Sequence, residues 1–297
     1  MFPASVSIRE VGPRDGLQAE APVSIEERVA FIDALAGTGL RTIEAVSFVS
    51  EKAVPAMAGA AEVMAKIDRS EEISYAALVP NLRGAQAAFE SNVDALTVTI
   101  SASETYSQKN TNRSIVESLA SVEEICAFVD ERVPVDVVIS CCFGSPYEGD
   151  IAPDVIGDLV RQGWDTGATA ITLADTTGMA TPRRIEDVLD ETGSDVGLHL
   201  HETRGTALVN AYAAIERGVW RFDTSVGGLG GSPFAAGAAG NLATEDLVHL
   251  LDDMGIPTGV DLDALLAVDV MLAELIGHPV ASNIAKAGPR SRLASAN

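Results

Sequence analysis

The sequence predicts a (β/α)8 TIM barrel with an additional C-terminal helical segment. Three observations favour this fold. Short β-branched or apolar runs alternate with longer segments of helical period, eight such units fit within 297 residues, and no linker or change in composition separates them. We therefore expect a single domain over residues 1–297, with a flexible tail from about residue 282.

The expected strands are the apolar runs that precede each helical segment. Val, Ile and Thr dominate these runs, as is typical of strands buried in a parallel sheet. The eight runs are SVSIRE (5–10), TIEAVSF (42–48), ISYAALV (73–79), ALTVTIS (95–101), VDVVISC (135–141), AITLAD (170–175), VGLHLH (196–201) and RFDTSV (221–226).

The segments between these strands carry signals for helix starts. Ser24 opens the first helix, Pro153 the fifth, Thr181 with the proline after it the sixth, and Thr244 with two following acids the eighth. Residues after about 258 (VDLDALLAVDVMLAELIG) predict one more amphipathic helix, which would cover the barrel or a partner subunit.

Composition excludes several function classes. The chain has 20 Lys plus Arg against 43 Asp plus Glu, a net charge of −23, so nucleic acids and anionic membrane surfaces are unsuitable partners. Its 3 cysteines form neither a disulfide framework nor a zinc-finger pattern. We see no secretory signal and no uninterrupted apolar run that would span a membrane, and we expect a soluble cytoplasmic protein.

In a TIM barrel the chemistry lies at the carboxyl ends of the strands. Two of the four histidines of this chain lie at the end of one predicted strand. His199 and His201 are two residues apart on one predicted strand, so both side chains share a face. Asp15 follows the first strand, and Asn241 follows the loop after the eighth. Two imidazoles with carboxylate and amide oxygens suit Mg²⁺ or Mn²⁺, whereas the alternative is a pair of hydrogen-bonded core histidines.

Two further segments are candidates for binding substrate. The glycine-rich run SVGGLGGSPFAAGAAGN (225–241) lies between a strand and a helix, which favours a substrate loop over a flexible linker, with Ser232 as a candidate proton donor. The polar stretch around Lys109 and Asn110 holds one of only four lysines; the alternative is a solvated loop. Arg14, beside Asp15, is either an active-site cation or half of an exposed ion pair.

Six motifs in the same order resemble the 3-hydroxy-3-methylglutaryl-CoA lyase family of the DRE-TIM metallolyase superfamily. They are EVGPRDGLQAE (10–20), IEAVSFVS (43–50), SETYSQKNTNRSI (103–115), SPYEG (145–149), HLHETRG (199–205) and GGLGGSPFAAGAAGNLATEDLV (227–248). The resemblance implies a TIM barrel, a divalent cation (Mg²⁺ or Mn²⁺) and cleavage of a carbon–carbon bond in a 3-hydroxyacyl-CoA. The products would be acetyl-CoA and a keto acid, acetoacetate.

Site roles follow from the same resemblance. Asp15, His199, His201 and Asn241 match metal ligands. Arg14 matches the arginine that stabilises the enolate oxygen, Glu44 and Glu245 match active-site acids, and Asp15 or His199 would relay the hydroxyl proton. The expected contacts of the acyl-CoA substrate are Arg14, Lys109, Asn110, Gly230 and Gly231. Because CoA is polyanionic and the chain is acidic, the cation, Arg14, Lys109 and Arg113 are expected to supply the positive charge of the site. We also expect a homo-oligomer, most simply a dimer.

The chain departs from the family pattern at three positions. Ser232 stands where the family loop has cysteine, Ala21 where it has lysine, and Glu202 where many relatives have Asp or Asn. A hydroxyl is a far weaker acid than a thiol. The alternatives are therefore a lyase for another 3-hydroxyacyl-CoA such as citramalyl-CoA, or a catalytically silent metal-binding barrel. A synthase of the condensing direction is a further alternative, but those chains usually carry an added carboxy-terminal domain.

Overall fold

Eight parallel strands close into a barrel in which each strand pairs with its neighbours in sequence order and β8 returns to β1. The computed structural model describes residues 2–231 and 239–292. Its strands are β1 (Ser7–Glu10), β2 (Thr42–Ser47), β3 (Ser74–Leu78), β4 (Ala95–Ser101), β5 (Val135–Ser140), β6 (Ala170–Ala174), β7 (Gly197–His199) and β8 (Arg221–Thr224). All eight lie within the runs that the sequence predicts, and the TIM-barrel prediction is confirmed.

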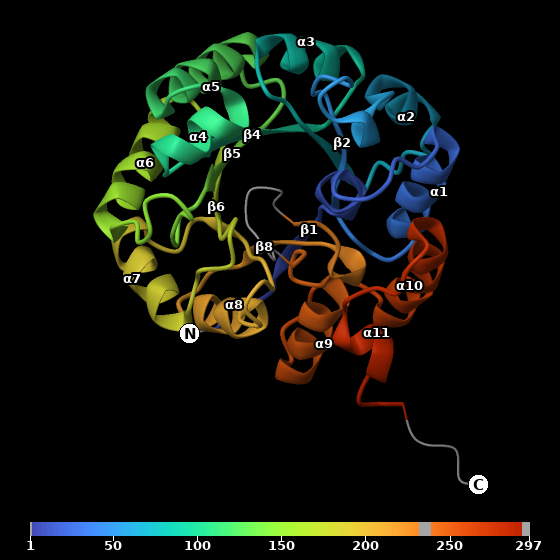
Figure 1. Ribbon diagram of the computed structural model, residues 1–297. Coiled ribbons are helices and arrows are strands. Elements are labelled where there is room, and N and C mark those ends of the chain that lie inside the picture. Colours follow the sequence, from blue (N-terminus) through green and yellow to red (C-terminus); the bar gives the residue numbers. More distant parts are fainter. Residues whose placement is uncertain (1, 232–238, 293–297) are drawn as a thin grey trace, which may run out of the picture.

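Helices form a ring around the strands (Figure 1). In chain order they are α1 (Ile25–Ala36), α2 (Ala60–Lys66), α3 (Leu82–Glu90), α4 (Glu104–Thr111), α5 (Ile115–Val129), α6 (Pro153–Asp165), α7 (Pro182–Thr192), α8 (Ala207–Glu216), α9 (Thr244–Met254), α10 (Leu262–Ile276) and α11 (Asn283–Ala287). None of these described helices combines the length and apolar character that crossing a bilayer requires.

Local capping explains where several helices begin. The Ser24 side chain accepts a hydrogen bond from the Glu27 backbone N–H, and the Glu27 carboxylate accepts one from the Ser24 N–H, which together form a capping box. Ser114 and Glu117 repeat the arrangement at α5. Thr181 caps α7, which starts with Pro182. These caps fix the loops that precede the helices at the carboxyl end of the barrel.

The C-terminal segment packs against the barrel's outer helices. The predicted amphipathic helix is α10, which contacts α1 and α9 (Figure 1). Beyond residue 282, where the sequence suggests a flexible tail, the structure contains α11, whose N-terminus is anchored to Asp246. Its carboxylate accepts hydrogen bonds from the Ser282 hydroxyl (2.7 Å) and the Ile284 N–H (2.9 Å). The last part of the expected tail, 293–297, lies outside the described residues.

Charged side chains from three strands meet inside the barrel. Arg9 on β1 donates to both carboxylate oxygens of Asp223 on β8, each at 2.8 Å, and pairs with Asp136 on β5 at 2.7 Å. The two carboxylates compensate the guanidinium, so this polar contact is tolerated within an otherwise apolar core. It lies directly beneath the residues at the barrel mouth.

Candidate active site

A cavity of about 460 Å³ opens among the carboxyl ends of the strands. We call it the mouth cavity. Polar residues at its floor come from widely separated parts of the chain: Arg14, Asp15, His199, His201 and Asp223. The lining also includes apolar side chains, among them Val49, Val54, Leu78, Val79, Val98 and Val138. The cavity is therefore suited to a ligand with both polar and alkyl parts.

A single π-helical turn, Gly12–Gly16, presents Arg14 and Asp15 to the mouth cavity. The backbone N–H groups of Arg14, Asp15 and Gly16 all approach the Val11 carbonyl, at 3.2, 2.7 and 3.2 Å. Gly12 is required here because a Cβ would lie 2.6 Å from the Glu10 carboxylate. Such turns are frequent at functional sites.

The two histidines converge with Asp15, as the sequence predicts. One ligand atom from each of Asp15, His199 and His201 lies within 4.8 Å of the other two. The His199 Nδ1 faces Asp223 Oδ2 at 3.1 Å and the His201 Nδ1 faces the Asp175 carbonyl at 3.0 Å. Since these oxygens only accept hydrogen bonds, each Nδ1 carries the proton and each Nε2 keeps its lone pair for the cavity.

Asn241 completes the cluster. A bridge between the backbones of Asn241 and His201 places it beside the histidines. Its amide nitrogen donates to Asp15 Oδ2 (2.7 Å) and to the Leu229 carbonyl (2.9 Å). Its amide oxygen is buried with no hydrogen-bond partner among the described residues. An orphaned oxygen beside a carboxylate and two imidazoles fits a divalent cation that prefers oxygen and nitrogen ligands.

The pKa shifts of Asp15 and His201 favour ligation, whereas that of His199 opposes it. Burial lowers the pKa of His201 to about 4, so that ring is neutral at pH 7. Burial alone would raise the pKa of Asp15, but Arg14 and the two histidines lower it to about 2. Burial alone would lower the pKa of His199, yet the hydrogen bond to Asp223 and the charge of Asp15 raise it overall. Asp15 is thus ionised across the physiological range.

Arg14 is held by two carboxylates. Its Nε donates to the buried Glu44 of β2, and its Nη1 donates to Asp15 Oδ1 at 2.5 Å. Arg14 lines the mouth cavity, whereas Glu44 does not. In this arrangement Glu44 orients Arg14 instead of facing the cavity itself.

Glu245, expected among the active-site acids, lies elsewhere in the described structure. Both its carboxylate oxygens accept from the Gly227 N–H, at 3.0 and 3.2 Å, and it does not line the mouth cavity. Burial and the neighbouring Asp269 carboxylate raise the pKa of Glu245 well above its ordinary range. The reason is local: Glu245 is in the first turn of α9, beneath the turn that begins the glycine-rich loop.

Some of the expected substrate contacts line the mouth cavity and others do not. Asn110 and Gly231 line the mouth cavity, as does Arg14. Gly230 packs against Asp15 and Asn241 of the candidate metal cluster, since a Cβ there would lie 2.5 Å from Asn241 Nδ2. Lys109 does not line the cavity; its ammonium lies 4.4 Å from the centre of the Tyr147 ring. Ser232 lies outside the described residues.

Sequence reasoning missed Asp223 and Arg9. The Asp223 carboxylate is hydrogen-bonded to His199 Nδ1 and to Arg9, which is 214 residues away in sequence. Burial alone would raise the pKa of Asp223, but Arg9 and His199 lower it, so Asp223 is ionised. An acidic residue in the middle of the predicted strand 221–226 was the available signal, because an uncompensated charge inside a barrel is costly.

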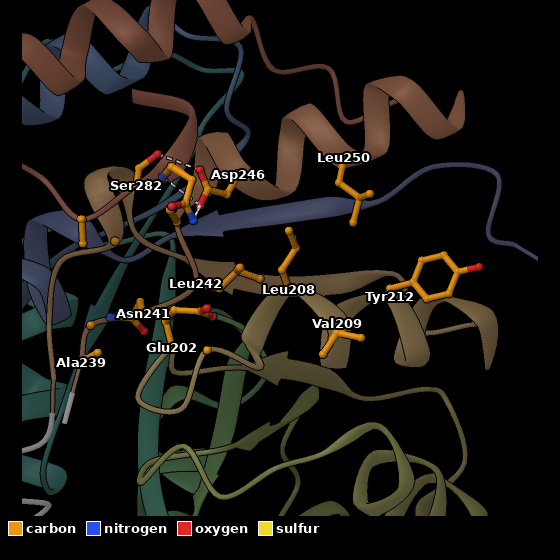
Figure 2. A pocket seen from close by; sticks show the side chains of 16 residues that line it. Glu202, Leu208, Val209, Tyr212, Ala239, Asn241, Leu242, Asp246, Leu250 and Ser282 are labelled. Carbon is orange, nitrogen blue, oxygen red and sulfur yellow. Dashed lines mark hydrogen bonds between the residues drawn. The ribbon is translucent and has the colours of Figure 1, made fainter. Parts of the chain in front are cut away.

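A second cavity, of about 450 Å³, lies outside the barrel between α8, α9 and the segment before α11. Figure 2 shows Leu208, Val209 and Tyr212 on one side, Leu250 on another, and Asn241 at one end. Its lining is mainly apolar; Asn241 is the one member of the candidate metal cluster on it, and the arginines and histidines of the mouth cavity are absent from its described lining. The chemistry therefore concentrates in the mouth cavity.

Comparison with known proteins agrees with this geometry. The HMGL-like family model matches residues 5–272. The chain is 40% identical to the hydroxymethylglutaryl-CoA lyase YngG of Bacillus subtilis, over 95% of this chain and 96% of that protein. It is 43% identical to the 3-hydroxy-3-isohexenylglutaryl-CoA/hydroxy-methylglutaryl-CoA lyase of Pseudomonas aeruginosa, over 96% and 98% of the two chains.

Solved structures give the same result. An HMG-CoA lyase from Acinetobacter baumannii, in complex with coenzyme A and 3-methylmalate, is similar with a TM-score of 0.95 and 40% identity, covering 100% of this chain and 99% of that one. The hydroxymethylglutaryl-CoA lyase structure from Pseudomonas aeruginosa is similar with a TM-score of 0.92 and 42% identity, covering 96% and 98%. Family model, sequence and fold agree over nearly the whole length, and the chain belongs to the HMGL-like family.

Proposed function

We propose that this protein is a divalent-metal-dependent carbon–carbon lyase that cleaves 3-hydroxy-3-methylglutaryl-CoA to acetyl-CoA and acetoacetate. The observation that carries the proposal is the cluster of Asp15, His199 and His201 beside Arg14 at the floor of the mouth cavity. The names of relatives about 40% identical over nearly the full length support the same substrate.

Asp15, His199, His201 and Asn241 are the residues that would hold the cation, and we propose Mg²⁺ or Mn²⁺. When bound, a divalent cation supplies Lewis acidity that makes the substrate's tertiary hydroxyl easier to deprotonate. The donor set contains no thiolate, which favours these two ions over softer metals.

The chain's own groups account for the remaining steps. The hydroxyl proton passes to the Asp15 carboxylate, which lines the mouth cavity. His199 is the alternative acceptor, provided that its Nε2 is not bound to the cation at that step. The bond between the second and third carbons then breaks, a ketone forms at the third carbon, and the electron pair moves into the thioester enolate. Arg14, permanently charged and fixed by Glu44, stabilises the enolate oxygen. We assign protonation of the enolate carbon to Ser232. Its hydroxyl regains a proton from the residue that took up the substrate's hydroxyl proton, so the enzyme groups are restored.

The assay is direct. Purified protein is incubated with 3-hydroxy-3-methylglutaryl-CoA and Mg²⁺ or Mn²⁺, and acetyl-CoA is measured by liquid chromatography. We expect acetyl-CoA with either metal and none after EDTA treatment. Citramalyl-CoA is tested in parallel because of Ser232. Absence of product from both thioesters would reject lyase activity and leave the catalytically silent barrel.

A Ser232→Cys variant separates the remaining alternatives. A large gain in turnover of 3-hydroxy-3-methylglutaryl-CoA would mean that the serine marks a decayed site, because a thiol is the stronger acid. No gain, together with turnover of citramalyl-CoA, would mean a different substrate. We further propose a cytoplasmic homodimer, which cell fractionation and light scattering would test.

A further inference from the structure

Positive charge is scarce around the mouth cavity. The substrate class proposed above carries a distal carboxylate and the phosphates of CoA, while the whole chain has a net charge of −23. Besides the histidines of the candidate metal cluster, two basic side chains, Arg14 and Arg113, line the cavity within the described part of the chain. An anionic ligand in this cavity therefore depends on the cation site and these two guanidinium groups.

The positive charge of Arg14 is already compensated by two carboxylates. Arg14 is paired with Glu44 and with Asp15, which is itself a member of the candidate metal cluster. Arg113 differs, because it forms no ion pair with any carboxylate in residues 2–231 and 239–292. Glu117, close by in sequence, directs its carboxylate to the Ser114 N–H and hydroxyl instead, at 2.8 and 2.9 Å.

Arg113 is also fixed in position. Its Nη1 donates to the Pro80 carbonyl and to the Ser121 hydroxyl, each at 3.1 Å, so the guanidinium is tied to the loop after β3 and to α5. One nitrogen is used in this way, and the remaining N–H groups of the fork have no hydrogen-bond partner among the described residues. Asn81, Asn110 and Ser118 line the same cavity with uncharged polar groups.

We propose that Arg113 binds an anionic oxygen group of the acyl-CoA substrate, either the distal carboxylate or a phosphate of CoA. The proposal rests on the proposed function. A half-buried guanidinium that is held rigidly, unpaired and directed along a ligand cavity is suited to bidentate recognition of either group. Lys109, the other expected cation of this region, is outside the cavity lining and covers Tyr147.

The test compares three variants. Arg113→Gln removes the charge but keeps a donor for the Pro80 carbonyl, Arg113→Lys keeps the charge, and Arg161→Gln is the control, since Arg161 lies on the exposed face of α6. We expect Arg113→Gln to raise KM for 3-hydroxy-3-methylglutaryl-CoA about tenfold with kcat within about twofold. Arg113→Lys should recover most of the loss, and Arg161→Gln should match wild type.

A second substrate identifies the anionic group. The pantetheine thioester of the same acid keeps the carboxylate but lacks the CoA phosphates. If Arg113→Gln leaves KM for this thioester unchanged, Arg113 binds phosphate; if KM rises equally for both thioesters, it binds the carboxylate. A KM equal to that of Arg161→Gln for both substrates overturns the proposal. So does a parallel loss of kcat and thermal stability without a change in KM, which would mean a purely structural role.

Equilibrium binding separates this proposal from the proposed reaction. The dissociation constant of 3-hydroxy-3-methylglutaryl-CoA is measured for wild type and Arg113→Gln in EDTA, which prevents turnover, and acetyl-CoA release is assayed separately with Mg²⁺. Wild-type protein that binds the thioester but releases no acetyl-CoA would refute the reaction, while the ratio of the two dissociation constants would still decide the role of Arg113. A ratio near one overturns the role.

Discussion

Replacing Asp223 by Asn tests how the metal cluster is held together. Asp223 accepts from His199 Nδ1 at 3.1 Å and from two nitrogens of Arg9 at 2.8 Å each. Asn keeps the shape but loses the charge and turns an N–H₂ group toward one of these donors. The tautomer that leaves His199 Nε2 free for a cation is then no longer enforced.

The expected magnitudes follow from these contacts. Loss of a carboxylate behind a ligating histidine typically costs about 10- to 100-fold in metal affinity. Breaking a buried ion pair costs ~3–5 kcal/mol. Because Arg9 keeps its 2.7 Å contact with Asp136, we expect a smaller loss of unfolding free energy, about 2 kcal/mol.

The assay is isothermal titration of Mn²⁺ into each protein, with urea denaturation for stability. Asp158→Asn is the matched control, because Asp158 pairs with Arg161 on the surface of α6, where the pair should contribute under ~1 kcal/mol. An Asp223→Asn protein that binds Mn²⁺ as tightly as wild type would refute the role assigned to Asp223, whatever its stability.

Two other predictions concern glycine geometry and pH. Gly230→Ala should weaken Mn²⁺ binding about tenfold or more, since its Cβ would lie 2.5 Å from Asn241 Nδ2 and 3.2 Å from Asp15 Oδ2 at a φ of +105°. Gly255→Ala, at a φ of +71° with nothing within 4 Å, should leave the titration unchanged, and equal affinities in both variants would contradict the packing argument. Burial raises the pKa of Glu10 to about 7 from the ordinary 4.5, so its contribution to stability is complete below about pH 4.5 and is lost as pH rises through 7. Wild type should therefore lose about 3 kcal/mol of unfolding free energy from this group between pH 5 and pH 9, and Glu10→Gln should flatten that dependence in urea titrations; parallel pH profiles would exclude Glu10 as the source.

The sequence was most informative where local pattern decides structure. The apolar run 95–101 coincides with β4, and capping signals located helix starts such as Ser24. The strand predicted over 221–226 ends earlier, at Thr224, because the backbone turns at Val226–Gly228, where Gly227 has a φ of +69°. Similarly, β7 ends at His199, and His201 is held instead by its bridge to Asn241.

The part of the site that lies at the ends of strands was predictable from the sequence. Asp15 and the histidine pair follow from the barrel rule and the two-residue spacing, and the structure brings these side chains together. Contacts made through three-dimensional packing were not predictable. Nothing local indicates that Glu245 turns toward Gly227, or that Arg9 reaches Asp136 across the barrel. The difference between Arg113, which lines the mouth cavity, and Lys109, which does not, likewise appears only once the contacts of both side chains are known.

The most direct test of the central claim is to locate the cation. Crystals grown with Mn²⁺ are measured with X-rays at the manganese absorption edge, where anomalous scattering identifies the ion. We predict one strong peak in the mouth cavity, within about 2.0–2.3 Å of a carboxylate oxygen of Asp15, Nε2 of His199 and of His201, and the amide oxygen of Asn241. A peak elsewhere, or none in crystals of protein whose lyase activity requires Mn²⁺, would contradict the assignment of these four residues.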